Sequence, residues 1–360
     1  MKVYLVGGAI RDEFLGLPVK DRDYVVVGSS VEEMESLGFE KVGQDFPVFI
    51  HPETKEEYAL ARTEKKKGVG YKGFEFEWKG VTLEEDLKRR DLTINSLARD
   101  VESGEVIDKF GGLNDLKLKI IQHVSVHFIE DPLRVLRVAR FFAYLPQFSV
   151  ATKTKILCEK ISQSGEIESL TPERVWLETQ KALKAASPWL YFDFLHDVNA
   201  LGILGDKERL NLEKLKLISQ HTDDIEIRFA SLFVPLKHEE DFLKSVIGIC
   251  QKLKVPKRIE KLCRITAKFS YLLREETQMD SENIYELIKE TQAMHDTALL
   301  DKFIFILRGH PSHNLYFSKL VHYLKQIDIS KKLEGVPTEK KQEFVKDEML
   351  KSIEEFNLKF

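Results

Sequence analysis

The pattern of apolar and polar residues changes character near residue 115. Before that point, short apolar runs rich in β-branched residues end at glycines or turn residues, which is typical of strands. We predict strands at Lys2–Val6, Tyr24–Val27, Val48–Ile50, Tyr58–Ala61, Phe74–Glu77 and Val106–Ile107. The third and fourth of these flank a turn at residues 51–54, which predicts a hairpin. The first 110 residues are therefore predicted to form mixed strands and turns.

After residue 115, apolar residues recur with the 3.6-residue period of an amphipathic helix. The predicted helices are Pro132–Tyr144, Thr171–Ala185, Trp189–Val198, Glu239–Leu253 and Ile284–Leu307. Thr171 and Pro172 indicate a helix start, because threonine suits the cap and proline suits the first helical position. The last 30 residues, rich in Lys and Glu, predict a solvated amphipathic helix and tail. The predicted fold class is α+β, a small mixed domain followed by helices.

Composition narrows the classes of function. The 55 Lys and Arg residues are balanced by 59 Asp and Glu, which gives a net charge of −4. This disfavours a generally basic nucleic-acid binder but not one local basic surface. Cys158, Cys250 and Cys263 form neither a zinc pattern nor a disulfide framework, so we expect reduced thiols in a cytoplasmic protein. We find no apolar run that could span a membrane and no signal peptide, and expect no membrane partner.

Residues 7–12 (GGAIRD) follow a predicted strand and precede a predicted helix. Two glycines let the backbone approach a ligand closely, and a helix start favours a phosphate. Arg11 could add a charge-assisted contact. The alternative is a purely structural Gly-Gly turn. The segment is neither a Walker loop nor a dinucleotide fingerprint, because the later glycines or lysine that these need are absent.

Asp21 and Asp23 lead into the strand Tyr24–Val27. Alternate strand residues point to one face, so both carboxylates project together. Two like charges side by side cost free energy unless a cation lies between them, and Mg²⁺ prefers such oxygen ligands. The alternative is a solvated strand edge.

Two arginine-rich segments follow. Residues 89–95 (RRDLTIN) place two arginines beside an apolar stretch, which suggests phosphate contacts. In the segment that begins at residue 130, Val135, Val138, Ala139 and Phe142 mark a buried helix face. Arg134, Arg137 and Arg140 step by three on the opposite face, without alternating acids, and predict an exposed anion-binding stripe. The alternatives are an exposed charge run and, for Asp131, a simple helix cap.

Together and in this order, the four segments resemble the class II tRNA nucleotidyltransferases, the CCA-adding enzymes, and their bacterial poly(A) polymerase relatives. Residues 17–23 and 42–48 look like the bacterial CCA-adding version. The likeness is dense over residues 1 to about 200 and thin beyond. It implies a polymerase-β-like nucleotidyltransferase head at 1–125, a helical neck for base recognition at 126–186, a helical body that binds tRNA at 187–275 and a helical tail at 276–360.

The resemblance implies template-independent addition of CCA to the 3′ end of tRNA from CTP and ATP, with release of pyrophosphate. Asp21 and Asp23 would be catalytic and would hold two Mg²⁺ ions, which clamp the attacking and leaving oxygens of an in-line displacement. Glu57 is a weaker candidate for a third carboxylate. Gly8 and Arg11 would hold the triphosphate with help from Arg90.

The resemblance also implies that protein, not a template, reads the incoming base. Cytosine and adenine both present an amino donor beside a ring-nitrogen acceptor. Asp131 can accept from that amino group and Arg134 can donate to the ring nitrogen, so guanine and uracil are rejected. Arg137 and Arg140 would contact phosphate or fix the two readers. This selects C and A but does not explain the switch between them.

The sequence departs from the family pattern in its second half. Many bacterial relatives carry a His-Asp phosphohydrolase domain, whereas residues 228–234 here read RFASLFV. We therefore predict no intact HD motif and no phosphohydrolase activity. Residues 251–274 hold eight Lys and Arg against one acid, and within them Lys257, Arg258 and Lys261 are candidate tRNA contacts. The competing explanation is a plain solvated helix face.

Alternative functions remain open from the sequence. One is a specialised relative, which adds only A or only CC to tRNA or makes poly(A). Residues 65–73 (KKKGVGYKG) predict a mobile loop that could support the C-to-A switch and favours full CCA addition. Another is a non-catalytic RNA-binding protein, which the intact Asp21 and Asp23 pair argues against. We expect a monomer.

Overall fold

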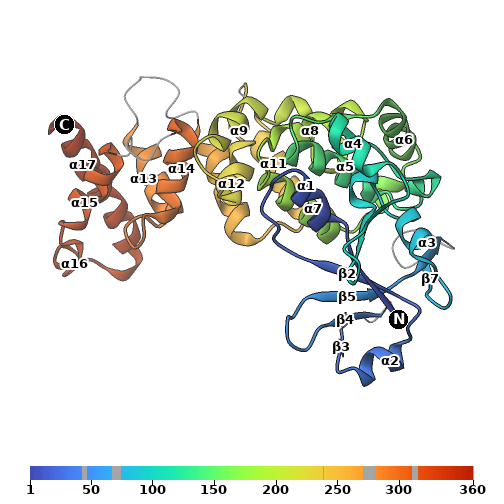
Figure 1. Cartoon of the computed structure of the whole chain (residues 1–360). Helices are drawn as coiled ribbons and strands as arrows, with labels where there is room; N and C mark the ends of the chain where they lie inside the picture. The colour runs from blue at the N-terminus through green and yellow to red at the C-terminus, as the bar shows by residue number, and fades with distance from the viewer. Residues whose placement is uncertain (43–46, 67–73, 238, 271–279, 310–314, 360) are drawn as a thin grey trace. The chain divides into compact units, whose positions relative to one another are not determined.

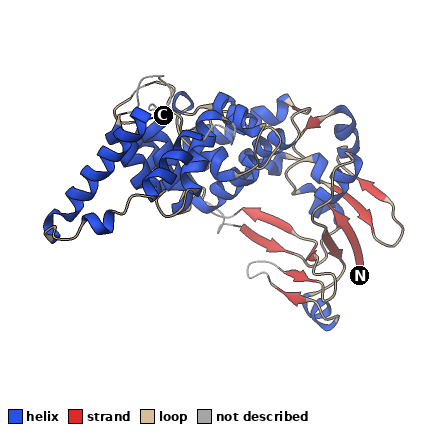
Figure 2. Ribbon diagram, turned by 90° about the vertical axis from the view of Figure 1, so that its left-hand side faces the viewer, coloured by secondary structure: helices blue, strands red, loops and turns tan. Residues whose placement is uncertain are grey.

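The computed structural model describes residues 1–42, 47–66, 74–237, 239–270, 280–309 and 315–359. These residues form two compact units, Met1–Ile203 and Leu204–Phe360 (Figure 1). Strands lie in the first unit, and the described part of the second unit is built of helices (Figure 2). The predicted α+β fold class is therefore confirmed. The finer division into head, neck, body and tail stays a prediction.

A seven-stranded sheet forms the core of the first unit. Its strands, in spatial order, are β3 (Glu40–Lys41), β4 (Val48–Ile50), β5 (Glu57–Leu60), β2 (Asp23–Val27), β1 (Lys2–Val6), β8 (Leu97–Asp100) and β9 (Val106–Asp108). Strands β2 and β5 pair in parallel, and the other neighbours pair antiparallel. The predicted hairpin is confirmed as β4 and β5.

Two short helices cover opposite faces of this sheet. Helix α2 (Val31–Ser36) places Met34 against Val26 and Leu60 on one face. Helix α3 (Leu83–Lys88) places Leu87 against the other face, which carries Val6 and Val25. Because strand side chains alternate between faces, Asp23 shares the α3 face with Val25. The sheet therefore directs Asp23 toward the polypeptide that follows α3.

Smaller elements complete the sheet-containing part of the first unit. They are α1 (Gly8–Phe14), β6 (Thr63–Lys66), β7 (Phe74–Glu77), η2 (Thr93–Asn95), α4 (Gly112–Leu118), β10 (Ile120–Ile121), η3 (Val126–Glu130) and β11 (Ser149–Val150). Strands β6 and β7 pair antiparallel as a separate ribbon. The predicted loop at residues 65–73 is thus wrong at its start, because residues 65 and 66 belong to β6. Its remainder, 67–73, lies outside the described residues, as do residues 43–46 of the segment 42–48.

Helices complete the first unit. They are α5 (Leu133–Tyr144), α6 (Thr152–Gln163), η4 (Glu166–Ser169), α7 (Pro172–Leu183), α8 (Trp189–Asp197) and η5 (Leu201–Ile203). Helix α5 packs against both α7 and α8. Val135, Val138 and Ala139 are buried, which confirms most of the predicted apolar face of α5, while Phe142 is only half-buried. Thr171 and Pro172 occupy the predicted cap and first helical position of α7.

The second unit is helical throughout its described residues. Its elements are η6 (Lys207–Arg209), α9 (Leu212–Ser219), α10 (Ile225–Ser231), α11 (Phe242–Lys252), α12 (Lys257–Phe269), α13 (Ser281–Thr291), α14 (Ala298–Arg308), α15 (Leu315–Lys325), α16 (Ile329–Lys332), η9 (Thr338–Lys340) and α17 (Lys341–Lys359). Neither unit contains, within the described residues, a helix long and apolar enough to cross a membrane.

Two predictions for the second unit are wrong in part. The single helix at Ile284–Leu307 is two helices, because Gln292 adopts a left-handed conformation and ends α13. Apolar periodicity continues across the break, since both helices bury one face, and this concealed the break. The C-terminal helix is not simply solvated, because α17 packs against α13 and α15 and buries Met349, Ile353 and Phe356.

Candidate active site

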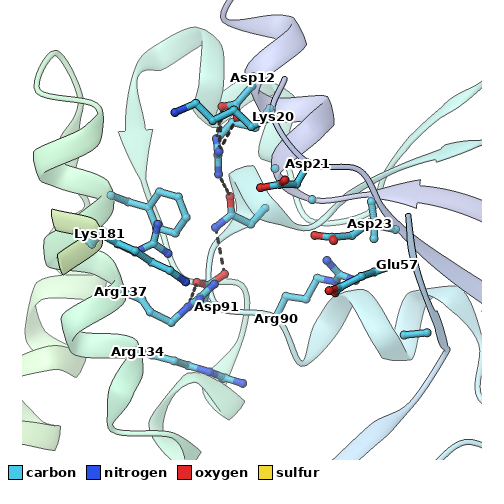
Figure 3. A pocket seen from close by; sticks show the side chains of 18 of the residues that line it. Asp12, Lys20, Asp21, Asp23, Glu57, Arg90, Asp91, Arg134, Arg137 and Lys181 are labelled. Carbon is cyan, nitrogen blue, oxygen red and sulfur yellow. Dashed lines mark hydrogen bonds and ion pairs between the residues drawn. The ribbon is translucent and has the colours of Figure 1, made fainter. Parts of the chain in front are cut away.

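A cavity of about 830 Å³ opens in the first unit, within the range of small-ligand sites. The turn between β1 and α1, the first residues of β2 and β5, the segment after α3, and helices α5 and α7 form its walls. Figure 3 shows Asp21, Asp23 and Glu57 on one side, with Arg134, Arg137 and Lys181 on the other. Every head and neck residue that the sequence nominated lines this cavity: Gly8, Arg11, Asp21, Asp23, Glu57, Arg90, Asp131, Arg134, Arg137 and Arg140.

The glycine turn lies against the arginine that follows α3. Gly7 has a φ of 74°, which L side chains rarely adopt. A Cβ at Gly7 would lie 3.2 Å from Nη1 of Arg90. The turn therefore needs glycine both for its backbone conformation and for its close approach to Arg90.

Arg11 projects from α1 into the cavity, but its guanidinium already has partners. It donates two hydrogen bonds to the Asp12 carboxylate, at 2.9 and 3.0 Å, and a third to Oδ1 of Asn95 at 2.6 Å. The ring of Phe141 lies 5.0 Å from the guanidinium carbon. Arg11 is therefore held in a fixed orientation, and its charge is partly balanced by Asp12 before any ligand arrives.

The carboxylates gather where β2 begins. Asp23 lies opposite Val6, the last residue of β1, and beside Glu57 in the parallel pair of β2 and β5. Burial raises the pKa of Asp23, the Arg90 charge lowers it, and the Asp21 charge raises it again, with a net rise. This net rise in pKa means that the ionised form of Asp23 is less stable in the folded protein than in water. A cation bound between the two aspartates would remove that cost.

The carboxylates of Asp21 and Asp23 suit a hard cation that is also bound by ligands from outside the protein. Among the residues that the structure describes, no group of three or more His, Cys, Asp or Glu side chains is arranged to hold a metal ion. Mg²⁺ is commonly bound by one or two carboxylates together with waters and substrate phosphates. Asp21 and Asp23 therefore fit Mg²⁺ that a nucleotide helps to bind, rather than a site made by protein alone.

Asp86 organises the arginines after α3, and sequence reasoning missed it. Its fully buried carboxylate accepts hydrogen bonds from Arg89 at 2.6 Å, from Arg90 at 3.1 Å and from the Arg62 backbone N–H at 3.2 Å. Burial alone would raise the pKa of Asp86, but the charges of Arg89 and Arg90 outweigh it and lower the pKa to about 2. Arg90 is thereby held beside Gly7.

Asp131 and Arg134 both line the cavity at the start of α5. The Asp131 carboxylate accepts a hydrogen bond from the Leu133 backbone N–H and pairs with Arg174 of α7 at 3.0 Å. Arg134 is buried, with its guanidinium donating to the carbonyls of His127 and Arg89. The predicted cap position is wrong by one residue, because α5 starts at Leu133 and Pro132 is its N-cap. Asp131 lies just before the cap, accepts from the first helical N–H and is also bound to α7.

The prediction of an exposed arginine stripe on α5 is wrong. Arg137 donates to Asp91 at 2.7 Å, and Arg140 donates to Glu178 of α7 at 2.6 Å. The side chains of Asp91 and Glu178 are only 5% and 4% exposed. Both acids lie about 40 positions away in the chain, so the local sequence could not reveal them. The half-buried side chains of Arg137 and Arg140 are therefore ion-paired to buried acids in the cavity wall.

Three lysines that line the cavity were not predicted from the sequence as site residues. Lys20 precedes Asp21, while Lys181 and Lys184 lie at the end of α7. Lys20 has a local signal, since it falls within the aspartate motif. The two α7 lysines have none, because only the packing of α7 against α5 brings them to the cavity.

Helix α12 of the second unit carries the predicted tRNA contacts Lys257, Arg258 and Lys261. The surface around α12 is less positive than the count of Lys and Arg in the helix suggests, because acids of neighbouring helices form ion pairs with it. Arg258 binds Glu226 of α10, and Lys268 binds Glu286 and Glu290 of α13. Lys257 pairs with Glu260 of the same helix. Residues 271–274 of the basic stretch lie outside the described residues.

The segment 228–234 forms the end of α10 and the turn after it. Arg228 is buried and donates to the carbonyls of Thr222 and Ser219, while Phe229 and Phe233 pack in the core. These residues have structural roles at the place where the family resemblance would put metal ligands. The absence of phosphohydrolase activity stays a prediction.

Comparison with known protein families finds a match for the sheet-containing part of the first unit. Residues 3–122 match the family model described as the poly A polymerase head domain. This match covers the seven-stranded sheet together with Gly8, Asp21, Asp23 and Arg90. The α+β fold is accordingly a mixed-sheet head domain of this description followed by helices.

Solved structures extend the likeness to nearly the whole chain. The apo form II of a CCA-adding enzyme is 21% identical, with a TM-score of 0.69 over 97% of this chain and 87% of that chain. A tRNA-processing enzyme complex is 25% identical, with a TM-score of 0.65 over 97% and 96%. A tRNA nucleotidyltransferase solved with a primer tRNA and an incoming ATP analogue is 25% identical, with a TM-score of 0.62 over 91% and 97%. The chain is thus similar in fold to tRNA nucleotidyltransferases.

Proposed function

We propose that this protein adds CCA to the 3′ end of tRNA, using CTP and ATP and releasing pyrophosphate. The observation that carries the proposal is one cavity lined by Asp21, Asp23, Asp131 and Arg134, with Arg134 across from the two aspartates (Figure 3). Carboxylates for phosphoryl chemistry and a donor–acceptor pair for a base thus share a single site. The similar structures include a tRNA nucleotidyltransferase with a primer tRNA and an ATP analogue.

The proposed transfer is a single displacement at the α-phosphorus. The 3′ oxygen of the RNA forms a bond to that phosphorus, the bond to the β-phosphate bridging oxygen breaks, and pyrophosphate and the hydroxyl proton leave. Asp21 and Asp23 would hold Mg²⁺, with Glu57 beside them as the weaker third candidate. Bound Mg²⁺ supplies charge stabilisation at the attacking and leaving oxygens.

The triphosphate is proposed to lie along the glycine turn. Gly8, Arg11 and Arg90 line the cavity beside Asp23, and all three belong to the same corner of the sheet. Asn95 and Asp12 fix the guanidinium of Arg11, and Asp86 fixes that of Arg90. Groups oriented before the ligand binds lose little conformational freedom when the reaction begins, which favours transition-state stabilisation.

Base selection is proposed to rest on Asp131 and Arg134. A carboxylate offers about four acceptor positions and a guanidinium five N–H donors, so both groups keep free capacity after their protein contacts. Asp131 would accept from the amino group of cytosine or adenine, while Arg134 would donate to the ring nitrogen. Arg174 holds Asp131, and two backbone carbonyls hold Arg134, so neither can turn to suit the reversed pattern of uracil or guanine.

Arg137 and Arg140 take a different role in this proposal. Their ion pairs with Asp91 and Glu178 orient the wall of α5 that carries the two base readers. We further propose that α12 contributes to tRNA binding through Lys257, Arg258 and Lys261, as a cytoplasmic monomer would need a surface for the body of its substrate. We also propose the division into head, neck, body and tail at the boundaries given in the sequence analysis.

The products of one incubation separate the candidate functions. A tRNA that lacks its 3′ CCA is incubated with CTP, ATP or both in the presence of Mg²⁺, and the extended ends are sequenced. We expect two C residues followed by one A. A product that ends at CC, gains only A or grows a long A tail selects the corresponding specialised enzyme. No incorporation with retained tRNA binding selects a non-catalytic RNA-binding protein.

Base selection has its own test. Asp131→Ala should allow UTP or GTP to be incorporated, whereas Asp197→Ala, an exposed aspartate of α8, serves as the matched control. Unchanged selectivity in Asp131→Ala would return this residue to the role of a helix cap.

A further inference from the structure

Two lysines at the end of α7 face the cavity without a role in the proposed nucleotide site. Lys181 lies in the last turn of α7 and Lys184 is its C-terminal cap, three positions later. Residues three apart lie on one helix face, and both lysines line the cavity. Figure 3 shows Lys181 on the wall across from Asp21 and Asp23. We call Lys181 and Lys184 the α7 lysine pair.

The α7 lysine pair differs from the arginines of the same cavity in its partners. Arg11, Arg90, Arg134, Arg137 and Arg140 are each bound by carboxylates, an amide or backbone carbonyls. Lys184 has no side-chain partner within the part of the chain that the structure describes. Lys181 lies 4.0 Å from Glu178, a carboxylate that Arg140 already binds at 2.6 Å. These two ammonium groups therefore retain charge for a ligand.

The position of the α7 lysine pair indicates which ligand this is. Arg174, which binds Asp131, lies seven positions before Lys181 on α7, or about 10 Å along the helix axis. One end of α7 thus lies beside the proposed base-reading residue Asp131, and the other end carries the α7 lysine pair. In the proposed function the nucleotide extends from Asp131 to Asp23, and the second anionic substrate in the cavity is the RNA whose 3′ oxygen attacks.

A cation at a helix C-terminus is also favoured by the helix dipole, which would explain lysines there without any ligand. If the helix dipole alone explained Lys181 and Lys184, lysines would show no preference for the cavity face of a helix end. Their removal would then not weaken RNA binding. The matched cases are Lys117 at the end of α4 and Lys160 at the end of α6. Both are exposed lysines in the last turn of a helix of the first unit, and neither lines the cavity.

We propose that the α7 lysine pair binds the phosphodiester backbone of the RNA close to its reacting 3′ end. This inference rests on the proposed function, and it adds the residues that hold the second substrate. Lysine suits the task, because its ammonium is a point charge on a flexible stem and needs no fixed geometry. The RNA end gains one nucleotide with each addition, and flexible ammonium groups can adapt to a longer end more readily than paired arginines.

The test compares two double variants of the full chain. Lys181→Gln/Lys184→Gln removes the α7 lysine pair, and Lys117→Gln/Lys160→Gln removes two matched lysines. Each is assayed for the KM of tRNA lacking CCA, for the KM of CTP, and for tRNA binding by fluorescence anisotropy between low and high salt. Unchanged unfolding midpoints show that both variants remain folded.

We expect the loss of the α7 lysine pair to raise the KM for tRNA about tenfold and to leave the KM for CTP within about twofold. The slope of log affinity against log salt should flatten by about 1.4, since each contact to single-stranded RNA contributes about 0.7. Lys181→Arg/Lys184→Arg, which keeps both charges, should restore most of the affinity. The control variant should behave like the wild type.

Three results would overturn the inference. They are an unchanged KM and salt slope for tRNA, a rise confined to the KM for CTP, and an equal loss in the control variant. The second result would assign the lysines to the triphosphate instead. Failure of the proposed function is distinguishable, because wild-type protein would then incorporate no nucleotide, while the anisotropy measurement would still compare the two variants.

Discussion

Helices α5 and α12 both carry cations at close helical spacing, yet the two regions use them differently. On α5, Arg137 and Arg140 are held by the buried acids Asp91 and Glu178 in the wall of a cavity. On α12, Lys257 and Arg258 are exposed, with side chains 87% and 76% accessible, although their acid partners Glu260 and Glu226 are buried. The same local pattern therefore produces a rigid wall in one unit and a solvated surface in the other.

The difference follows from how far the cations are exposed. On α5 the arginine side chains are themselves partly covered, 33% exposed for Arg137 and 16% for Arg140, whereas the cations of α12 extend into solvent. Burial alone would raise the pKa of Asp91, but Arg137 and hydrogen bonds lower it well below its usual range. Pairs whose cation is largely exposed, such as those on α12, are screened by water and contribute less. Charge spacing alone does not distinguish these two cases.

The largest effect is expected where a buried partner of α5 is removed. Asp91→Ala leaves Arg137 and Asn95 without their shared acceptor. We expect the free energy of unfolding to fall by about 3 kcal/mol, because the buried Asn95 amide and the half-buried Arg137 guanidinium lose their acceptor. Urea unfolding followed by tryptophan fluorescence measures this, since Trp78, Trp176 and Trp189 all lie in the first unit.

The control for Asp91→Ala is the exposed pair of Asp197 with Lys155 in the same unit. Asp197→Ala should cost less than about 1 kcal/mol. Equal losses in the two variants would remove the distinction between buried and surface pairs.

A smaller, pH-dependent effect is expected at Asp86. Its pKa in the folded protein is about 2, against an ordinary value of 3.8. The ionised carboxylate therefore stabilises the fold above about pH 4, and this stabilisation is lost as the pH falls toward 2. Asp86→Asn should lower the free energy of unfolding by about 2 kcal/mol at pH 7.

The measurement for Asp86 is urea unfolding of both proteins at a series of pH values. The gap between Asp86→Asn and wild type should narrow between about pH 4 and pH 2. A gap that stays constant over this range would show that the charges of Arg89 and Arg90 do not stabilise the carboxylate.

A third variant tests a half-exposed pair that joins two helices of the second unit. Lys268 of α12 binds Glu286 and Glu290 of α13, and its side chain is 35% exposed. Lys268→Gln should cost less than about 1 kcal/mol, because solvent screens both pairs. Far-UV circular dichroism during urea unfolding measures it, and a loss as large as that of Asp91→Ala would contradict the comparison.

The smallest effect on stability is expected from the exposed cations of α12. Replacing Lys257, Arg258 and Lys261 by glutamine should leave the unfolding midpoint unchanged. Binding of tRNA should weaken, and its salt dependence should flatten by about 1 for each phosphate that the variant no longer binds. An unchanged salt slope would remove α12 from the tRNA footprint.

The fold could be predicted where local sequence decides it. Strands at Lys2–Val6 and Phe74–Glu77, the hairpin at β4 and β5, and the start of α7 were all predicted, because alternation, turns and capping act over a few residues. The break between α13 and α14 was missed, because it depends on the left-handed backbone of one residue, Gln292.

The site was predictable as a set of residues but not as an arrangement. Asp21, Asp23, Asp131 and Arg134 were named from spacing and from a family resemblance, and they do line one cavity. Their partners Asp86, Glu178 and Arg174 were missed, as were the lysines Lys181 and Lys184. Packing of α5 against α7 and the burial of Asp86 bring these groups together, and neither leaves a signal in the local sequence.

The central claim is that the cavity with Asp21 and Asp23 performs nucleotidyl transfer. Incorporation of radiolabelled CTP into tRNA lacking CCA, measured for wild type and for Asp21→Asn/Asp23→Asn with tRNA binding followed in parallel, tests it most directly. We predict incorporation by the wild type, none above the enzyme-free control for the variant, and equal tRNA binding by both. Turnover retained by the variant would contradict the claim.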